Sequence, residues 1–111
     1  MYLTILTSTT TPIAYKQLDL KLNELIQQTQ CYLFTILVHS KVKELELGAI
    51  WAKNNGAPTC YIQETKQAKI FEKILFKSDY IIFLFDKQDV VIKQLFMKYK
   101  MMNKHGTVIQ L

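Results

Sequence analysis

Short apolar runs alternate along the chain with longer stretches in which apolar residues recur every three or four positions. The apolar runs cover residues 2–8, 31–39, 58–63, 80–85 and 107–111. The stretches between them have the periodicity of amphipathic helices. Because strands that alternate with helices form parallel sheets, the pattern predicts an α/β fold. We expect one domain over residues 1–111, with a mainly parallel five-stranded sheet and four helices on both of its faces.

The first two predicted helices have recognisable ends. Thr11 followed by Pro12 suits the start of a helix over about 12–30, because proline fits the first helical position. Ser40 stands where it could cap the second helix. Gly56 suits the end of that helix, because glycine readily adopts the left-handed conformation that closes many helices.

The last two helices are bounded in the same way. Thr65 is the predicted cap of the third helix, and Asp86 with Asp89 resembles a carboxylate cap for the fourth, which should end at His105 and Gly106. The residues that we expect to face the sheet are Leu18, Leu22, Leu25, Ile26, Val42, Leu45, Ala49, Ala52, Ala68, Phe71, Ile74, Leu75, Val91, Leu95 and Met102.

Composition supports one compact domain. Half of the 111 residues are apolar and 21% are charged, which argues against disorder. Cys31 and Cys60 each stand beside a tyrosine in an apolar run, where a free cysteine packs as a small apolar side chain. The spacing of these cysteines relative to His39 and His105 matches no zinc site, so neither a metal nor a cofactor is predicted. The first apolar stretch is too short for a signal peptide or a membrane span, so we expect a cytoplasmic protein without a membrane partner.

The basic residues are all lysines. The chain has a net charge of +5, with 14 basic residues and no arginine among them. Arginine is the residue that forks onto phosphate or onto a guanine edge, so its absence disfavours specific base readout. Lysines can still neutralise phosphates as point charges, which leaves a weaker nucleic-acid association open.

Candidate ligand-binding residues follow the predicted strands, because ligands of open α/β sheets bind at the carboxyl ends of the strands. Thr7, Ser8 and Thr9 form a hydroxyl-rich turn after the first strand, suited to a phosphate or ribose. The alternative is that Thr11 caps the helix and the other hydroxyls meet solvent. Trp51 is more typical of packing or of a dimer contact than of base stacking.

The second and fourth strands also end in polar residues. His39, Ser40 and Lys41 could hold an anion at a helix N-terminus, although a capping serine beside exposed lysines explains them as well. Asp86 could accept hydrogen bonds from ribose hydroxyls or simply cap a helix. No acid is placed in the sequence to orient His39 as a base, so no catalytic residue is predicted.

Several strings follow one family pattern. Residues 47–53 read LGAIWAK and precede GAP at 56–58, residues 78–86 read SDYIIFLFD, and residues 106–109 read GTVI. These strings and their order resemble the SLOG superfamily over nearly the whole chain. That group includes the LOG phosphoribohydrolases and the DNA-processing protein DprA, and the likeness is greatest to its small YspA-like branch. The resemblance implies a Rossmann-like fold and a nucleotide-derived ligand.

The sequence departs from this family where the family has glycine-rich loops. Residues 39–44 read HSKVKE and residues 87–90 read KQDV, both without glycine. Glycine matters in such loops because a residue without Cβ lets a row of backbone N–H groups close on a phosphate. The catalytic glycine-rich string of the LOG enzymes is also missing, so the resemblance does not extend to their hydrolysis.

Two hypotheses of function follow. The first is a non-enzymatic protein that binds a nucleotide or nucleotide-derived ligand as a homodimer, a sensor or sequestering protein of the kind that a phage or mobile element encodes. The second is an interaction or inhibitor protein that kept the fold without a working pocket. It would contact a protein partner, or nucleic acid through Lys93, Lys98 and Lys100. A hydrolase with other chemistry is a third, weaker hypothesis.

Overall fold

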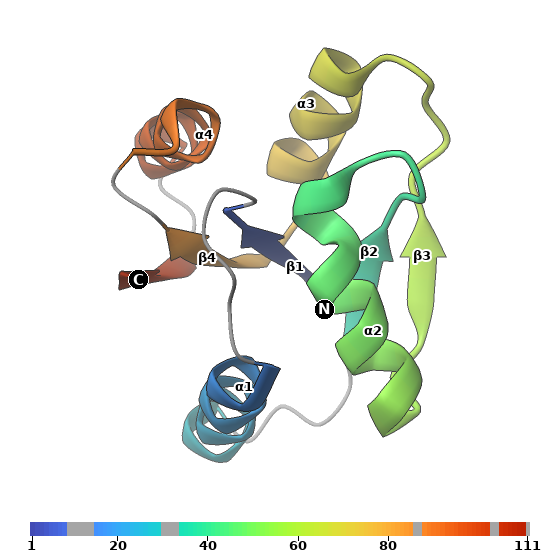
Figure 1. The fold of residues 1–111 in the computed structure, drawn as a ribbon, viewed down its shortest axis with the longest axis vertical. Helices are drawn as coiled ribbons and strands as arrows, with labels where there is room; N and C mark the ends of the chain where they lie inside the picture. Colours follow the sequence, from blue (N-terminus) through green and yellow to red (C-terminus); the bar gives the residue numbers. More distant parts are fainter. Residues whose placement is uncertain (9–14, 30–33, 86–87, 103–104, 111) are drawn as a thin grey trace.

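A computed structural model describes residues 1–8, 15–29, 34–85, 88–102 and 105–110 (Figure 1). Strands and helices alternate within these ranges, which confirms the predicted α/β class with a parallel sheet. The elements are β1 (Tyr2–Thr7), α1 (Tyr15–Thr29), β2 (Thr35–Val38), the 3₁₀ helix η1 (Lys43–Leu45), α2 (Glu46–Asn55), β3 (Thr59–Tyr61), α3 (Gln67–Lys77), β4 (Tyr80–Phe85), α4 (Val90–Met101) and β5 (His105–Gln110).

The chain reverses its direction of travel across the sheet. The strands lie in the order β3-β2-β1-β4-β5, and all neighbouring pairs are parallel. The chain moves outward from β1 to β3 and then returns to place β4 on the other side of β1. In open α/β sheets a reversal of this kind leaves a crevice at the carboxyl ends of the strands. The crevice expected here lies between β1 and β4.

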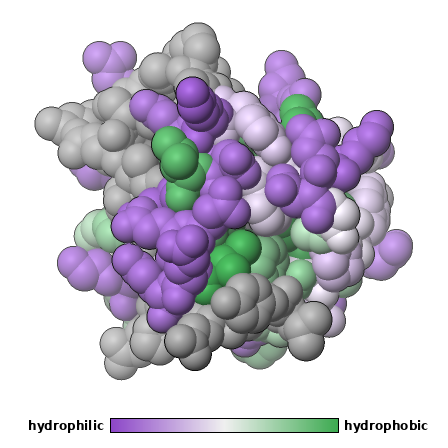
Figure 2. Space-filling view, turned by 90° about the horizontal axis from the view of Figure 1, so that it is seen from below, coloured by the Kyte–Doolittle hydropathy of each residue, from purple (hydrophilic) through white to green (hydrophobic). Residues whose placement is uncertain are grey.

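The helices cover the two faces of the sheet in pairs. Leu18 of α1 and Trp51 of α2 share one apolar cluster with Leu3 and Ile5 of β1. The other cluster joins residues of α3 and α4 to the opposite face. Figure 1 shows the two pairs on either side of the sheet. Seen from the side of α1 and α2, most of the described surface is hydrophilic, with smaller hydrophobic areas between (Figure 2).

A glycine lets α2 lie directly on the central strand. A Cβ at Gly48 would stand 3.0 Å from the Cβ of Ile5, closer than side chains normally pack. Strand β1 pairs with β2 at Tyr2 and Leu3, whereas it pairs with β4 as far as Thr7. The segment that follows β2 contacts β1 through η1, and its Leu45 is buried. Apolar side chains from this segment therefore join the core at the carboxyl end of β1.

Trp51 is a packing residue that joins α2 to α1. Its side chain is buried, its ring stacks on Phe34 with centroids 6.0 Å apart, and its Nε1 donates a hydrogen bond to Oδ1 of Asp19 over 2.9 Å. Burying an indole is favourable when its N–H finds an acceptor, as here. Trp51 is thus part of the core, and its own ring is not exposed for base stacking.

Two predicted helix caps are wrong. Ser40 does not cap α2, because the chain makes a turn and the 3₁₀ helix first, and η1 has Val42 at its N-cap without a side-chain hydrogen bond. Thr65 does not cap α3, because that helix begins two residues later with Lys66 at its N-cap. Ala68, expected to face the sheet, is consequently exposed. The predicted closing glycine, Gly56, is confirmed with φ at 65°.

The fourth helix is rotated relative to the expectation. Leu95 is buried as predicted, but Val91 and Met102 are exposed, and the buried stripe consists of Ile92, Leu95 and Tyr99. The predicted inward orientation of Val91 and Met102 is therefore wrong. The helix itself carries apolar residues on more than one face, so periodicity alone did not identify the face that packs on the sheet. The predicted stop at His105 and Gly106 is also wrong, since both residues belong to β5.

Other boundaries moved less. β3 is shorter than the predicted 58–63, and β4 matches its prediction at both ends. The described part of the second strand begins at Thr35. The predicted cap at Thr11 and Pro12, and Cys31 in the predicted second strand, lie outside the described residues.

Asp89 caps α4, and we expect its removal to weaken the fold. Its Oδ1 accepts hydrogen bonds from the backbone N–H groups of Val91 and Ile92, at 3.1 and 3.2 Å. Losing such a cap costs about 1 kcal/mol, whereas asparagine retains an acceptor oxygen. Urea unfolding of Asp89→Ala should show about this loss in the free energy of unfolding, and Asp89→Asn should show clearly less. Equal losses in the two variants would contradict the capping role.

Tyr99 should make the fold sensitive to alkali. Burial, with smaller contributions from the charges of Asp79 and Tyr80, raises the pKa of its phenol to about 12. Between pH 10 and 12 the unfolded chain releases this proton while the folded chain keeps it, so rising pH favours unfolding over that interval. Urea unfolding should therefore show a steeper loss of stability above pH 10 in the wild type than in Tyr99→Phe. Parallel pH profiles would refute this assignment.

Candidate ligand site at the carboxyl ends of the strands

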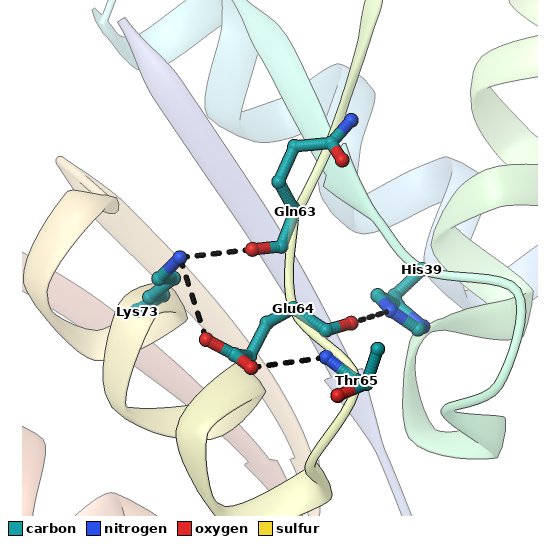
Figure 3. Close-up of polar contacts among 5 residues, drawn as sticks. All are labelled: His39, Gln63, Glu64, Thr65 and Lys73. Atoms are coloured by element: carbon teal, nitrogen blue, oxygen red, sulfur yellow. Dashed lines mark hydrogen bonds and ion pairs between the residues drawn. The ribbon is translucent and has the colours of Figure 1, made fainter.

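His39 joins the end of β2 to the segment between β3 and α3. Its ring is buried and its Nε2 lies 2.7 Å from the carbonyl oxygen of Glu64 (Figure 3). Its Nδ1 lies 3.1 Å from the backbone nitrogen of Lys41. A backbone N–H can only donate and a carbonyl can only accept, so Nδ1 is the acceptor and Nε2 carries the hydrogen. This arrangement fixes a neutral imidazole with both nitrogens engaged.

Glu64 extends this connection to α3. Its carboxylate accepts a hydrogen bond from the backbone N–H of Thr65 and lies 3.6 Å from Nζ of Lys73. The hydrogen bond from the Thr65 N–H is the main cause that holds the pKa of Glu64 below its usual value. Desolvation, the second-largest cause, opposes it, and the charges of Lys73 and Lys69 lower the pKa by smaller amounts. Lys73 also donates to the carbonyl oxygen of Gln63 over 2.9 Å. Figure 3 shows these contacts as one chain from α3 to His39.

Three predicted ligand-binding residues line one cavity. His39, Ser40 and Lys41 border a hollow of about 390 Å³ between the end of β2, the start of α2 and β3. The full lining is Val38, His39, Ser40, Lys41, Val42, Lys43, Glu46, Ala49 and Tyr61. Lys41 and Lys43 are exposed, and with Glu46 they leave the lining with a net positive charge. The composition of the lining suits a small anionic ligand with an apolar part.

Tyr61 completes this cavity, and sequence reasoning missed it. Its ring stacks on His39 with centroids 4.7 Å apart and remains 44% exposed. Its hydroxyl lies 3.3 Å from His39 Nε2 and 3.4 Å from Oγ of Ser40. The only signal in the sequence was an aromatic residue in a short edge strand, and that signal does not reveal which ring faces a cavity.

Thr7 and Ser8 lie at the same edge of the sheet, at the carboxyl end of β1. Both are buried, and the backbone N–H of Ser8 donates to the carbonyl oxygen of Leu84 over 2.8 Å. Among the residues that the structure describes, the buried Oγ1 of Thr7 has no hydrogen-bond partner. Buried hydroxyls nearly always have a partner, so an orphan at the reversal point between β1 and β4 is a site where a ligand or water could bind. The predicted Thr9 and Asp86 lie outside the described residues.

The described contacts of His39 suit it to holding the edge of the cavity in place. Both of its ring nitrogens are engaged, through the Glu64 carbonyl, the Lys41 N–H and the Tyr61 hydroxyl. Within the described ranges, no group of three His, Cys, Asp or Glu residues could hold a metal ion. No helix among those described is long and apolar enough to cross a membrane.

A larger hollow lies on the other side of β3. It measures about 740 Å³ and is lined by Tyr61, Ile62, Gln63, Glu72, Lys73, Phe76 and Lys77. Lys77 places its Nζ 3.6 Å from Sγ of Cys60 and over the ring of Tyr2. Two lysines and Glu72 give this larger hollow the same net charge as the cavity at His39, so charge does not favour it as an anion site. None of the residues predicted to bind a ligand lines it.

Comparison with known proteins found no matching family model, no matching curated protein and no matching solved structure. The assignment of a ligand site therefore depends on the geometry of the residues described above.

If His39 is a structural link, its loss should cost stability. His39→Phe keeps an aromatic ring against Tyr61 but leaves the Glu64 carbonyl and the Lys41 N–H without their partner. Leaving a buried polar group unsatisfied costs about 1–3 kcal/mol. Both hydrogen bonds of His39 are part-buried, so we expect a loss near the lower end of that range, about 1 kcal/mol, in urea unfolding. Tyr61→Phe, which removes only the longer hydroxyl contacts, should lower the free energy of unfolding by less. If His39→Phe leaves the free energy of unfolding unchanged, His39 is not a structural link.

Proposed function

We propose that this protein is a non-enzymatic binder of a nucleotide or nucleotide-derived anion, which it senses or sequesters at the carboxyl ends of its strands. The observation that carries the proposal is the cavity in which His39, Ser40 and Lys41 meet Tyr61. Tyr61 stacks one side of its ring on His39 and is partly exposed, so it offers a platform for a base. Lys41 and Lys43 supply positive charge for phosphate at the rim.

The orphan hydroxyl of Thr7 supports the same proposal. An unpaired buried oxygen at the reversal point between β1 and β4 is a place where a ribose hydroxyl or phosphate oxygen would gain a hydrogen bond. The resemblance of the sequence to the SLOG superfamily points to the same class of ligand. A Rossmann-like domain with the glycine-poor loop 39–44 would hold phosphate through lysine side chains rather than through a row of backbone N–H groups.

Native mass spectrometry of freshly purified protein tests the proposal directly. A released molecule with a nucleotide-like mass, at one copy per chain, is the expected result, and the same spectrum reports whether the chain is a homodimer. If no small molecule is retained, thermal denaturation with a panel of mono-, di- and cyclic nucleotides should reveal one that raises the melting temperature. Nucleotide binding would be refuted if the mass spectrum shows only ligand-free protein and no nucleotide of the panel raises the melting temperature.

Tyr61→Ala should weaken binding of the nucleotide identified in this way by about tenfold, because stacking of a base on an aromatic ring is worth about 1–3 kcal/mol. Tyr61→Phe is the matched control, since it keeps the ring and should retain most of the affinity. Isothermal titration calorimetry measures both. An equal loss in the two variants would assign the effect to the hydroxyl and would exclude stacking.

Thr7→Val should separate stability from binding. The substitution removes an unpaired buried hydroxyl at nearly constant shape, so the ligand-free protein should be as stable as the wild type or more stable by about 1 kcal/mol. Nucleotide affinity should fall, because the ligand loses its hydrogen bond to Oγ1. Urea unfolding and calorimetry measure the two effects. A destabilised variant with unchanged affinity would show that Thr7 serves the fold alone.

A further inference from the structure

The fourth helix has a second apolar face that the core does not use. Ile92, Leu95 and Tyr99 pack inward, whereas Val90, Met97 and Met101 are 63%, 54% and 85% exposed. A helix that covers a sheet needs only one apolar stripe. Large apolar side chains that gather on an exposed surface instead are typical of an interaction site.

The exposed residues follow the spacing of a coiled-coil seam. Val90, Gln94, Met97 and Met101 are separated by four, three and four positions, the d-a-d-a order of a heptad repeat. We name these four residues the outer seam of α4. Their spacing keeps them on one line along the helix, opposite the buried stripe, so a second helix could lie along them.

Lysines flank the outer seam on both sides. In the same heptad, Lys93 and Lys100 occupy g positions and Lys98 occupies an e position, and all three are exposed. The residues of α4 from Val90 to Met101 include no acid, and Asp89 at the N-cap is buried and engaged with the helix. Residues at e and g select the partner of a coiled coil through their charges. The lysines that flank the outer seam therefore favour a partner helix with negative charges at the facing positions.

This charge pattern argues against a second copy of the chain as the occupant. Pairing two α4 helices along their seams would place lysines opposite lysines, which is unfavourable. An acidic helix would place glutamates or aspartates opposite Lys93, Lys98 and Lys100. Methionines in the seam suit such a contact, because the flexible thioether side chain adapts to different neighbours.

The surface around the outer seam is hollowed. A concavity of about 650 Å³ is lined by Val90, Lys93, Gln94, Met97 and Lys98. A smaller groove of about 180 Å³ lies between α4 and α3, lined by Ala68, Phe71, Glu72, Leu75, Val91, Gln94, Leu95 and Lys98. Side chains of a partner helix can fill such concavities, as in helix-in-groove recognition.

We propose that the outer seam of α4 docks an acidic amphipathic helix of a partner protein. The proposal stands apart from ligand binding, because none of the seam residues or flanking lysines lines the cavity with His39 and Tyr61. It names a chemical class of partner: a helix with apolar residues at a and d and acidic residues at e and g.

Binding of synthetic helices to the full chain tests this. One labelled peptide carries leucine at a and d with glutamate at e and g, and its matched control carries lysine at e and g. The variant Lys93→Glu, Lys98→Glu, Lys100→Glu reverses the flanks of the seam. A control variant with the same net charge, Lys16→Glu, Lys21→Glu, Lys53→Glu, reverses three lysines on α1 and α2. Fluorescence anisotropy measures the affinity of each pair.

The wild type should bind the acidic peptide, and the seam variant should lose about tenfold in affinity for it and gain a similar factor for the basic peptide. The α1 and α2 variant should keep the wild-type preference. Met97→Ser with Met101→Ser, which alters no charge, should also weaken binding of the acidic peptide. Equal losses in both charge variants would mean nonspecific attraction and would overturn the proposal.

Two further probes exclude other partners. Vesicles of phosphatidylcholine with phosphatidylserine, and a single-stranded oligonucleotide, are titrated under the same conditions. Should either bind with dependence on the seam lysines while the acidic peptide does not bind, the seam is a membrane or nucleic-acid surface and the proposal is wrong. Failure of every probe to bind the wild type overturns it as well.

Discussion

The fold depends on burying the first strand on all sides. β1 pairs with β2 on one edge and β4 on the other, and apolar helices cover both of its faces. Residues Leu3, Ile5 and Leu6 are fully buried as a result. Gly48 lets α2 approach Ile5 closely, and a buried hydrogen bond of 2.6 Å between the hydroxyls of Thr4 and Ser78 satisfies a polar group within the strand. The two strands that flank β1 then pair with the outer strands, β2 with β3 and β4 with β5.

The sequence predicted the elements well where burial on two faces leaves a long apolar run, as in β4. It failed where several residues compete for one role. Ser40 and Thr65 both have the chemistry of a cap, but the helices begin later. The chain first turns and buries Val42 before η1, and Lys66 rather than Thr65 is the N-cap of α3. In α4, apolar residues on two faces gave no unique inward stripe. Tertiary packing decided between faces that local periodicity could not distinguish.

For the candidate site, the rule for open sheets pointed to the carboxyl ends of the strands, where His39, Ser40 and Lys41 line one cavity. The role of His39 could not be read from the sequence, because it depends on Glu64 and Tyr61, which are distant along the chain. His39 accepts a hydrogen bond from one backbone N–H and donates one to a backbone carbonyl, and so it connects two loops. The same hydrogen bonds hold the imidazole against the Tyr61 ring at the cavity, so under the proposed function one side chain serves both stability and ligand recognition.

The order of the strands also constrains how the chain is made. The hydrogen bond from Tyr2 to Asp79 joins residues 77 positions apart, and β1 has its full complement of neighbours only when β4 is present. During synthesis at about 5–20 residues per second, the apolar β1 waits roughly four seconds or more for that partner. Over this time its second edge is open to other chains. Folding should therefore be slow and sensitive to concentration, even though the finished domain is small.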